Sequence, residues 1–130
     1  MRPFENRKRF MILHVTKDLM MSSTARSHAQ SQGVEIAFAN SMKAAIEKLQ
    51  SGSYRLCLAD LQMPGLEMEQ LAEVANQQNA STIVYVQHVQ VDTLEKAKEV
   101  GFGEVMTRGQ FNKSLGQIMV AAKSSEGDAP

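Results

Sequence analysis

The sequence predicts an α/β domain built on a doubly wound parallel sheet of five strands, with the element order (βα)5. Short apolar runs alternate along the chain with segments whose apolar residues repeat at helical spacing. The runs are almost continuously apolar, which is typical of strands covered by helices on both faces. Because crossovers between parallel strands are right-handed, the helices between the strands are expected on both faces of the sheet.

Each strand is predicted where β-branched and other apolar residues form a run of four to six, as they do in short buried strands. The last of these runs is the weakest, because it begins with a glutamate and ends with a threonine. The five predicted strands are Phe10–Val15, Val34–Ala39, Tyr54–Ala59, Thr82–Val86 and Glu104–Thr107.

The helices are predicted from apolar stripes and from residues that favour helix ends. Asp18 is expected to cap the first helix, and either Asn40 or Ser41 the second. The fourth is expected to start with a capping-box-like Asp92 and Glu95. The first stripe is small and polar, which predicts looser packing. The inward stripes are Met21, Thr24, Ala25, His28 and Ala29; Met42, Ala45, Ile46 and Leu49; Met68, Leu71, Ala72 and Ala75; and Phe111, Leu115, Ile118 and Met119.

Composition predicts one domain, residues 10–122, between a short basic arm at 1–9 and a flexible tail at 123–130. The 130 residues are 43% hydrophobic, and their formal net charge is zero. This balance does not favour a nucleic-acid or membrane surface, and no stretch approaches a membrane span. Cys57 is the single cysteine, so no internal disulfide is expected. The chain is therefore expected to be cytoplasmic.

Asp60 is the most informative residue, because it follows the third apolar run and precedes the turn Leu61-Gln62-Met63-Pro64-Gly65. This position is the carboxyl end of a buried strand, and ligands collect at that edge of open parallel sheets. An aspartate before a turn can also simply accept hydrogen bonds from nearby backbone N–H groups.

The segment from Asp60 to Gly65, at the end of the third βα unit, resembles the phosphoacceptor strand and turn of a response-regulator receiver domain of the chemotaxis-regulator type. The resemblance extends over residues 9–120. It implies a flavodoxin-like fold and a role in two-component, or phosphorelay, signalling. It also implies that Asp60 occupies the phosphoacceptor position.

The acidic pair that holds Mg²⁺ in that family is missing. Thr16 and Lys17 stand in its place, and Asp18 comes one position late. Mg²⁺ prefers near-octahedral oxygen ligands, and beside Asp60 only the Gln62 carbonyl remains as a family ligand. Mg²⁺ binding is therefore not expected, and no other metal or cofactor is predicted. Lys17 is expected to pair with Asp60 and to take the cation's place.

Other family positions are also altered. Where the fourth strand of the family ends in a small hydroxyl residue, this chain has Gln87 followed by His88. Val105 stands at the aromatic switch position of the fifth strand. Arg108 replaces the family's lysine, keeping the charge but as a planar fork rather than a compact ammonium.

These departures favour a degenerate receiver, or pseudo-receiver, that acts by phosphorylation-independent protein–protein interaction and is not an enzyme. The expected partner is a protein, either a histidine kinase or another signalling protein, and a homodimer is left open. One alternative is an active receiver that a histidine kinase still phosphorylates on Asp60. The other is an unrelated flavodoxin-like ligand-binding domain, although the segment after the first strand lacks a glycine to cradle a phosphate.

Overall fold

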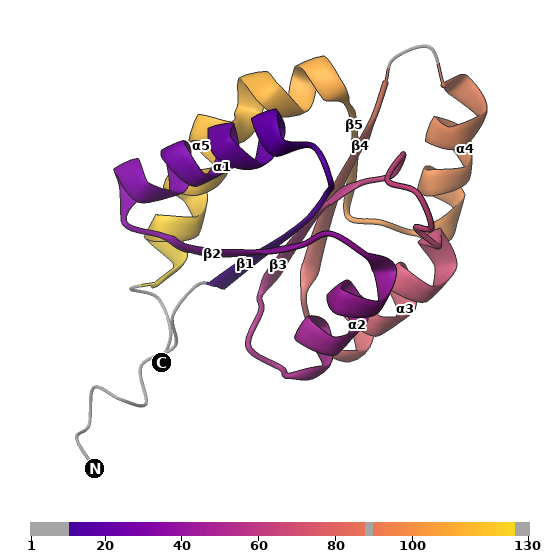
Figure 1. Cartoon of the computed structure of the whole chain (residues 1–130), viewed down its shortest axis with the longest axis horizontal. Coiled ribbons are helices and arrows are strands. Elements are labelled where there is room, and N and C mark those ends of the chain that lie inside the picture. Colours follow the sequence, from indigo (N-terminus) through magenta and orange to yellow (C-terminus); the bar gives the residue numbers. More distant parts are fainter. Residues whose placement is uncertain (1–10, 88–89, 127–130) are drawn as a thin grey trace.

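Five parallel strands form one sheet in the order β2-β1-β3-β4-β5 in a computed structural model that describes residues 11–87 and 90–126 (Figure 1). The strand carrying Asp60, β3, lies at the centre of the sheet, between β1 and β4. The predicted fold class is confirmed. The strands are β1 (Met11–Val15), β2 (Glu35–Ala39), β3 (Leu56–Asp60), β4 (Ser81–Val86) and β5 (Glu104–Thr107).

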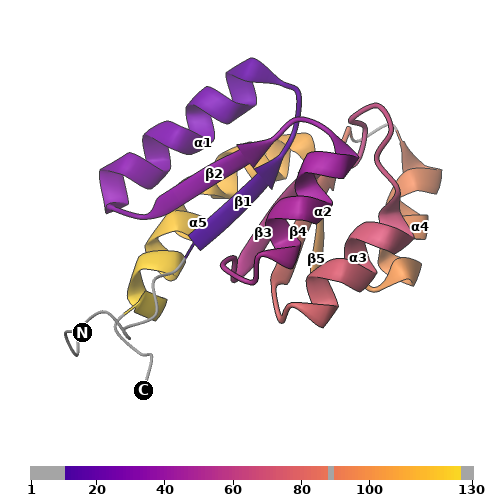
Figure 2. The ribbon, with the colours of Figure 1, turned by 60° about the horizontal axis from the view of Figure 1, so that its bottom comes forward.

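Helices cover both faces of the sheet (Figure 2). One face is covered by α1 (Leu19–Gln32) and α5 (Arg108–Glu126), and the other by α2 (Met42–Gln50), α3 (Met68–Gln77) and α4 (Val91–Val100). Each face has its own apolar core, one containing Leu58 and Phe111 and the other Leu13 and Leu71. In the described part of the chain no helix is long and apolar enough to cross a membrane.

Two predicted caps are confirmed and one is wrong. The Asp18 carboxylate accepts a hydrogen bond from the Met21 N–H at 3.0 Å, and the Ser41 hydroxyl accepts one from the Ala44 N–H at 3.1 Å. The capping box at Asp92 does not form, because the N-cap of α4 is Gln90, two residues earlier, and it makes no side-chain cap. Asp92 instead lies in the first turn, where its charge complements the helix dipole.

The first and last helices differ in detail from the prediction. Ser22 of α1 is buried and donates a hydrogen bond to the Asp18 carbonyl at 2.9 Å, whereas Thr24 and His28 of the predicted stripe are only half-buried. The last helix continues to Glu126, so the predicted start of the tail at Lys123 comes too early. The buried Ala122 extends the apolar stripe beyond Met119, which keeps this end of α5 on the core. The basic arm and residues 127–130 lie outside the described residues.

Gly103 allows a close approach between the start of β5 and β4. A Cβ atom at this position would lie 2.8 Å from the Thr82 carbonyl oxygen, which is backbone and cannot turn away. Gly103→Ala is therefore expected to lower the free energy of unfolding by about 1–3 kcal/mol. Gly109→Ala, where a Cβ would meet nothing within 4 Å inside α5, is expected to raise it by about 0.5–1 kcal/mol. Denaturant unfolding of both variants checks the pair, and equal effects would contradict this assignment.

Candidate functional site

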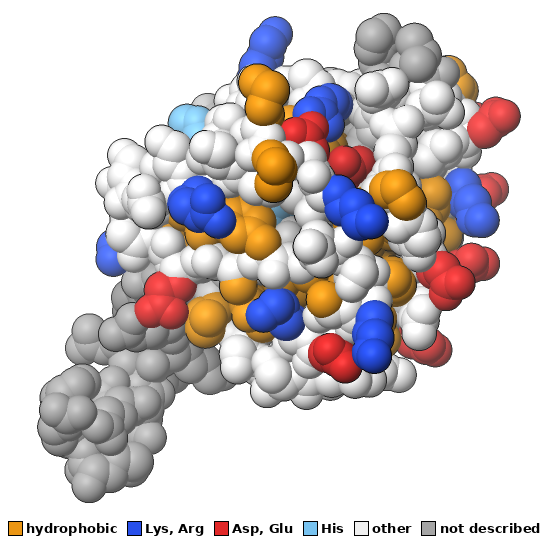
Figure 3. Space-filling view, viewed as in Figure 1, with side chains coloured by type: hydrophobic (Ala, Val, Ile, Leu, Met, Phe, Trp, Pro, Cys, Tyr) orange, Lys and Arg blue, Asp and Glu red, His pale blue; other side chains and the backbone are white. Residues whose placement is uncertain are grey.

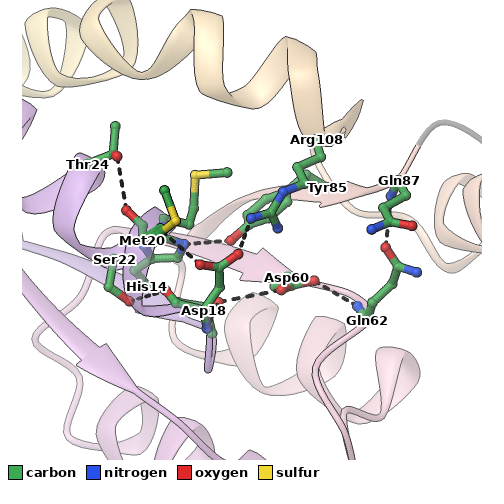
Figure 4. Close-up of polar contacts among 12 residues, drawn as sticks. His14, Asp18, Met20, Ser22, Thr24, Asp60, Gln62, Tyr85, Gln87 and Arg108 are labelled. Atoms are coloured by element: carbon green, nitrogen blue, oxygen red, sulfur yellow. Dashed lines mark hydrogen bonds and ion pairs between the residues drawn. The ribbon is translucent and has the colours of Figure 1, made fainter.

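The carboxyl ends of the parallel strands bring polar residues together at one edge of the sheet (Figure 4). Thr16 follows β1, Asp60 ends β3, and Gln87 follows β4. Arg108 begins α5 directly after β5. Of the predicted site residues, the structure gathers Thr16, Asp18, Asp60, Gln62, Gln87 and Arg108 at this edge, and His88 lies outside the described residues.

Both carboxylate oxygens of Asp60 have hydrogen-bond donors. Oδ1 accepts a bond from the Gln62 N–H at 2.9 Å (Figure 4), and Oδ2 lies 3.5 Å from the Thr16 hydroxyl. The first contact is the local turn interaction of an aspartate with the backbone two residues further on. The second is long, so the Thr16 contact is the weaker of the two.

Gln62 connects two strands at this edge. Its side-chain Oε1 accepts a hydrogen bond from the Gln87 N–H at 2.9 Å, while its own N–H donates to Asp60. The turn after β3 is thereby attached to the end of β4. Both glutamines are exposed, so solvent competes for these contacts.

The predicted ion pair between Lys17 and Asp60 is wrong. Lys17 is exposed and has no ion pair with any described residue, whereas Arg108 pairs with Asp18. The Met21 N–H and the Arg108 guanidinium hold the pKa of the Asp18 carboxyl below its ordinary value. The same pairing raises the pKa of Arg108, with the Asp60 charge as a minor contribution.

A buried histidine and tyrosine, neither predicted as a site residue, lie directly behind Asp60. His14 Nε2 is 2.8 Å from the Tyr85 hydroxyl, and Tyr85 is the β4 residue that pairs in register with Asp60. Burial lowers the pKa of His14 from 6.5 to about 4, opposed by the Asp18 charge. Burial and the Asp60 charge raise the pKa of Tyr85. The sequence contained a signal for this pair, because a histidine and a tyrosine within buried strands each need a polar partner.

Val105 and Cys57 both pack with the apolar residues of one core. Val105 pairs with Val84 across β5 and β4 and is half-buried against the core that α4 covers. Cys57 is fully buried, and burial raises the pKa of its thiol to about 12, which makes a reactive thiolate unfavourable.

A groove of about 670 Å³ lies between α3 and α4 at the start of β4, at the opposite end of that strand from Gln87.

Comparison with known protein families identifies the family of this chain. The family model described as the response regulator receiver domain matches residues 12–119. The chain belongs to the response regulator receiver domain family. Asp60 therefore lies at the end of the third strand of a receiver domain, and an unrelated ligand-binding domain is set aside. A search of curated proteins found no match.

Solved receiver domains have the same fold at low sequence identity. The signal receiver domain of a putative LuxO repressor protein from Vibrio parahaemolyticus is 16% identical, with 92% of this chain and 93% of that chain covered and a TM-score of 0.74. A CheY-like receiver domain protein from Methanospirillum hungatei is 14% identical, covering 93% and 98%, with a TM-score of 0.75. The chemotaxis response regulator CheY4 of Vibrio cholerae is 14% identical, covering 88% and 99%, with a TM-score of 0.73.

The side chains of this receiver domain do not fit a magnesium ion at the Asp60 edge. Thr16 and Lys17 supply a hydroxyl and an ammonium in place of carboxylates, and Asp18 is occupied by Arg108. Among the described residues no three His, Cys, Asp or Glu side chains come together as a metal-binding group. Mg²⁺ is usually held by carboxylates and waters in octahedral geometry, which this donor set does not provide.

Proposed function

We propose that this receiver domain signals by phosphorylation-independent contact with another protein and has no enzymatic activity of its own. The observation that carries this proposal is the state of Asp60, whose two oxygens already accept hydrogen bonds from Gln62 and Thr16. Phosphoryl transfer needs positive charge to stabilise the transferring group, and a metal ion usually supplies it. Here the Arg108 guanidinium, a cation at the same edge, is paired with Asp18.

The proposed partner is a protein rather than a nucleic acid. On the face shown in Figure 3, basic and acidic side chains are interspersed, without the continuous basic patch that phosphate backbones require. The family resemblance favours the surface formed by α4, β5 and α5 as the contact face. Consistent with this, β5 is an edge strand, and Val91 of α4 and Val120 of α5 are 58% and 48% exposed. The partner is a histidine kinase, another signalling protein or a second copy of the chain.

Intact-mass analysis after incubation with acetyl phosphate, with and without Mg²⁺, tests this proposal. The wild-type chain is expected to show no phosphoryl adduct, and to match Asp60→Ala in both conditions. An ordinary receiver domain treated in parallel shows that the reagent is active. A Mg²⁺-dependent adduct on the wild type that Asp60→Ala lacks would overturn the proposal.

A second candidate is an active receiver that is phosphorylated on Asp60 by a histidine kinase. The Asp60 charge contributes to the raised pKa of Arg108, which places the guanidinium within electrostatic reach of that carboxylate. Lys17, exposed and without an ion pair to the described residues, is a second cation at the same edge. In this candidate the two cations replace part of the metal's charge. An adduct that forms equally without Mg²⁺ would favour it.

A further inference from the structure

The Asp18 carboxylate joins the two helices that cover one face of the sheet. Its Oδ1 accepts the hydrogen bond from the Met21 N–H that caps α1, and its Oδ2 accepts one from Arg108 Nη2 at the start of α5 (Figure 4). One carboxylate therefore caps the start of α1 and also holds the first residue of α5 in place. The pair is partly sheltered, since the side chains of Arg108 and Asp18 are 36% and 25% exposed.

Thr16 extends this contact to the phosphoacceptor position. Its Oγ1 accepts a hydrogen bond from the Asp18 N–H at 3.0 Å and donates to Asp60 Oδ2 at 3.5 Å. The start of α5, the loop after β1 and the end of β3 are thus connected through Arg108, Asp18, Thr16 and Asp60. The guanidinium is the positive charge in this connected set.

A metal ion bound at such an edge would neutralise carboxylates and hold the loop after β1 against the end of β3. Arg108 neutralises Asp18 and holds the loop after β1 against the start of α5, because a guanidinium is permanently charged and presents several N–H donors in a rigid plane. Its anchor, Asp18, stands one position after the two residues that replace the family's acidic pair. The ion pair gives the acid in that loop a role other than holding a metal ion.

We infer that the Arg108 guanidinium is the built-in cation of this edge, holding Asp18 beside Asp60 in the place of a divalent metal ion. Removing the guanidinium leaves the Asp18 carboxylate without its paired cation, in the loop that Thr16 connects to Asp60. A hard divalent cation can then bind oxygen ligands that the guanidinium had blocked. This inference concerns ion occupancy and does not depend on whether Asp60 accepts a phosphoryl group.

Titration with Mn²⁺ tests the inference. Two readouts monitor it: the Tm of thermal unfolding, and the paramagnetic broadening of the Thr16 and Gln62 amide signals in NMR spectra. The wild type is expected to show no change in Tm and no selective broadening. Arg108→Gln is expected to have a lower Tm without metal, to regain part of it with Mn²⁺, and to bind Mn²⁺ at least about tenfold more tightly than the wild type.

Asp18→Asn separates the ion pair from the helix cap, because asparagine caps helices about as well as aspartate. This variant keeps the guanidinium and loses one carboxylate, so it is expected to gain no Mn²⁺ binding. Arg26→Gln is the matched control. Arg26 is an arginine of α1 whose guanidinium lies over the Phe38 ring, 4.7 Å from the ring centroid, and not on Asp18. Selective Mn²⁺ binding by the wild type, or equal Mn²⁺ responses of Arg108→Gln and Arg26→Gln, would overturn the inference. The phosphoryl-adduct experiment is separate, so the two proposals fail independently.

Discussion

Lowering the pH from about 7 to about 4 is expected to remove roughly 3 kcal/mol from the free energy of unfolding through His14 alone. Burial lowers the pKa of His14 from 6.5 to about 4, so the folded state keeps this ring neutral where the unfolded chain is protonated. The contribution is complete above about pH 6.5 and is lost as the pH falls towards about 4.

The surroundings of His14 explain why its charged form is unfavourable. The ring is fully buried between Phe38, Tyr85 and Phe111, and its Nδ1 has no hydrogen-bond partner among the described residues. A second proton would therefore add a charge and a donor without an acceptor. Asp18, whose pKa lies below 3.8, loses its own contribution only at lower pH.

Urea unfolding at a series of pH values measures this effect. His14→Gln is expected to be less stable than the wild type near pH 7 and to show a much flatter dependence between about pH 6.5 and about pH 4. His28→Gln is the matched control, because His28 is half-buried on α1, and it should keep the wild-type slope. An unchanged slope in His14→Gln would contradict the assignment.

Replacing Phe111 by alanine is expected to lower the free energy of unfolding by about 3–5 kcal/mol. The ring is fully buried and stacks on Tyr85, with centroids 4.0 Å apart and planes at 15°. Its removal leaves a cavity between α5 and the sheet and takes away the surface that holds the Tyr85 ring behind Asp60. Because α5 begins three residues earlier, at Arg108, the loss reaches the functional edge as well as the core.

Denaturant unfolding also checks this prediction. Phe111→Leu retains most of the apolar volume and is expected to be destabilised much less than Phe111→Ala. Lys113→Ala, an exposed position in the same helix, is expected to change stability by less than about 0.5 kcal/mol. A loss below about 1 kcal/mol in Phe111→Ala would show that the core repacks around the missing ring.

The fold could be predicted because its elements depend on local patterns. The run from Leu56 to Ala59 is apolar throughout because it is buried on both faces, and the caps at Asp18 and Ser41 follow from short-range backbone chemistry. The N-cap of α4 was missed by two residues, since Val91 can begin a helix without a capping side chain. The position of Asp60 followed from the same local reasoning.

The contacts between distant residues could not be predicted in this way. Arg108 and Asp18 are 90 residues apart, and either Asp18 or Asp60 offers that guanidinium a carboxylate. Charge alone favoured Lys17 as the partner of Asp60, but its side chain is directed into solvent while Asp18 caps the helix. His14 and Tyr85 are 71 residues apart, and β3 lies between their strands. Their side chains still meet, because both are directed to the same face of the sheet.

The central place of β3 bears on where the domain can move. Its amides are hydrogen-bonded between two neighbouring strands, so their hydrogen exchange should require opening of the whole sheet. The edge strands β2 and β5 can exchange by local fraying. Asp60 thus ends an interior strand, while Arg108 follows an edge strand, which can open locally. Local opening at this edge is therefore expected in the β5–α5 junction more readily than in the strand that carries the carboxylate.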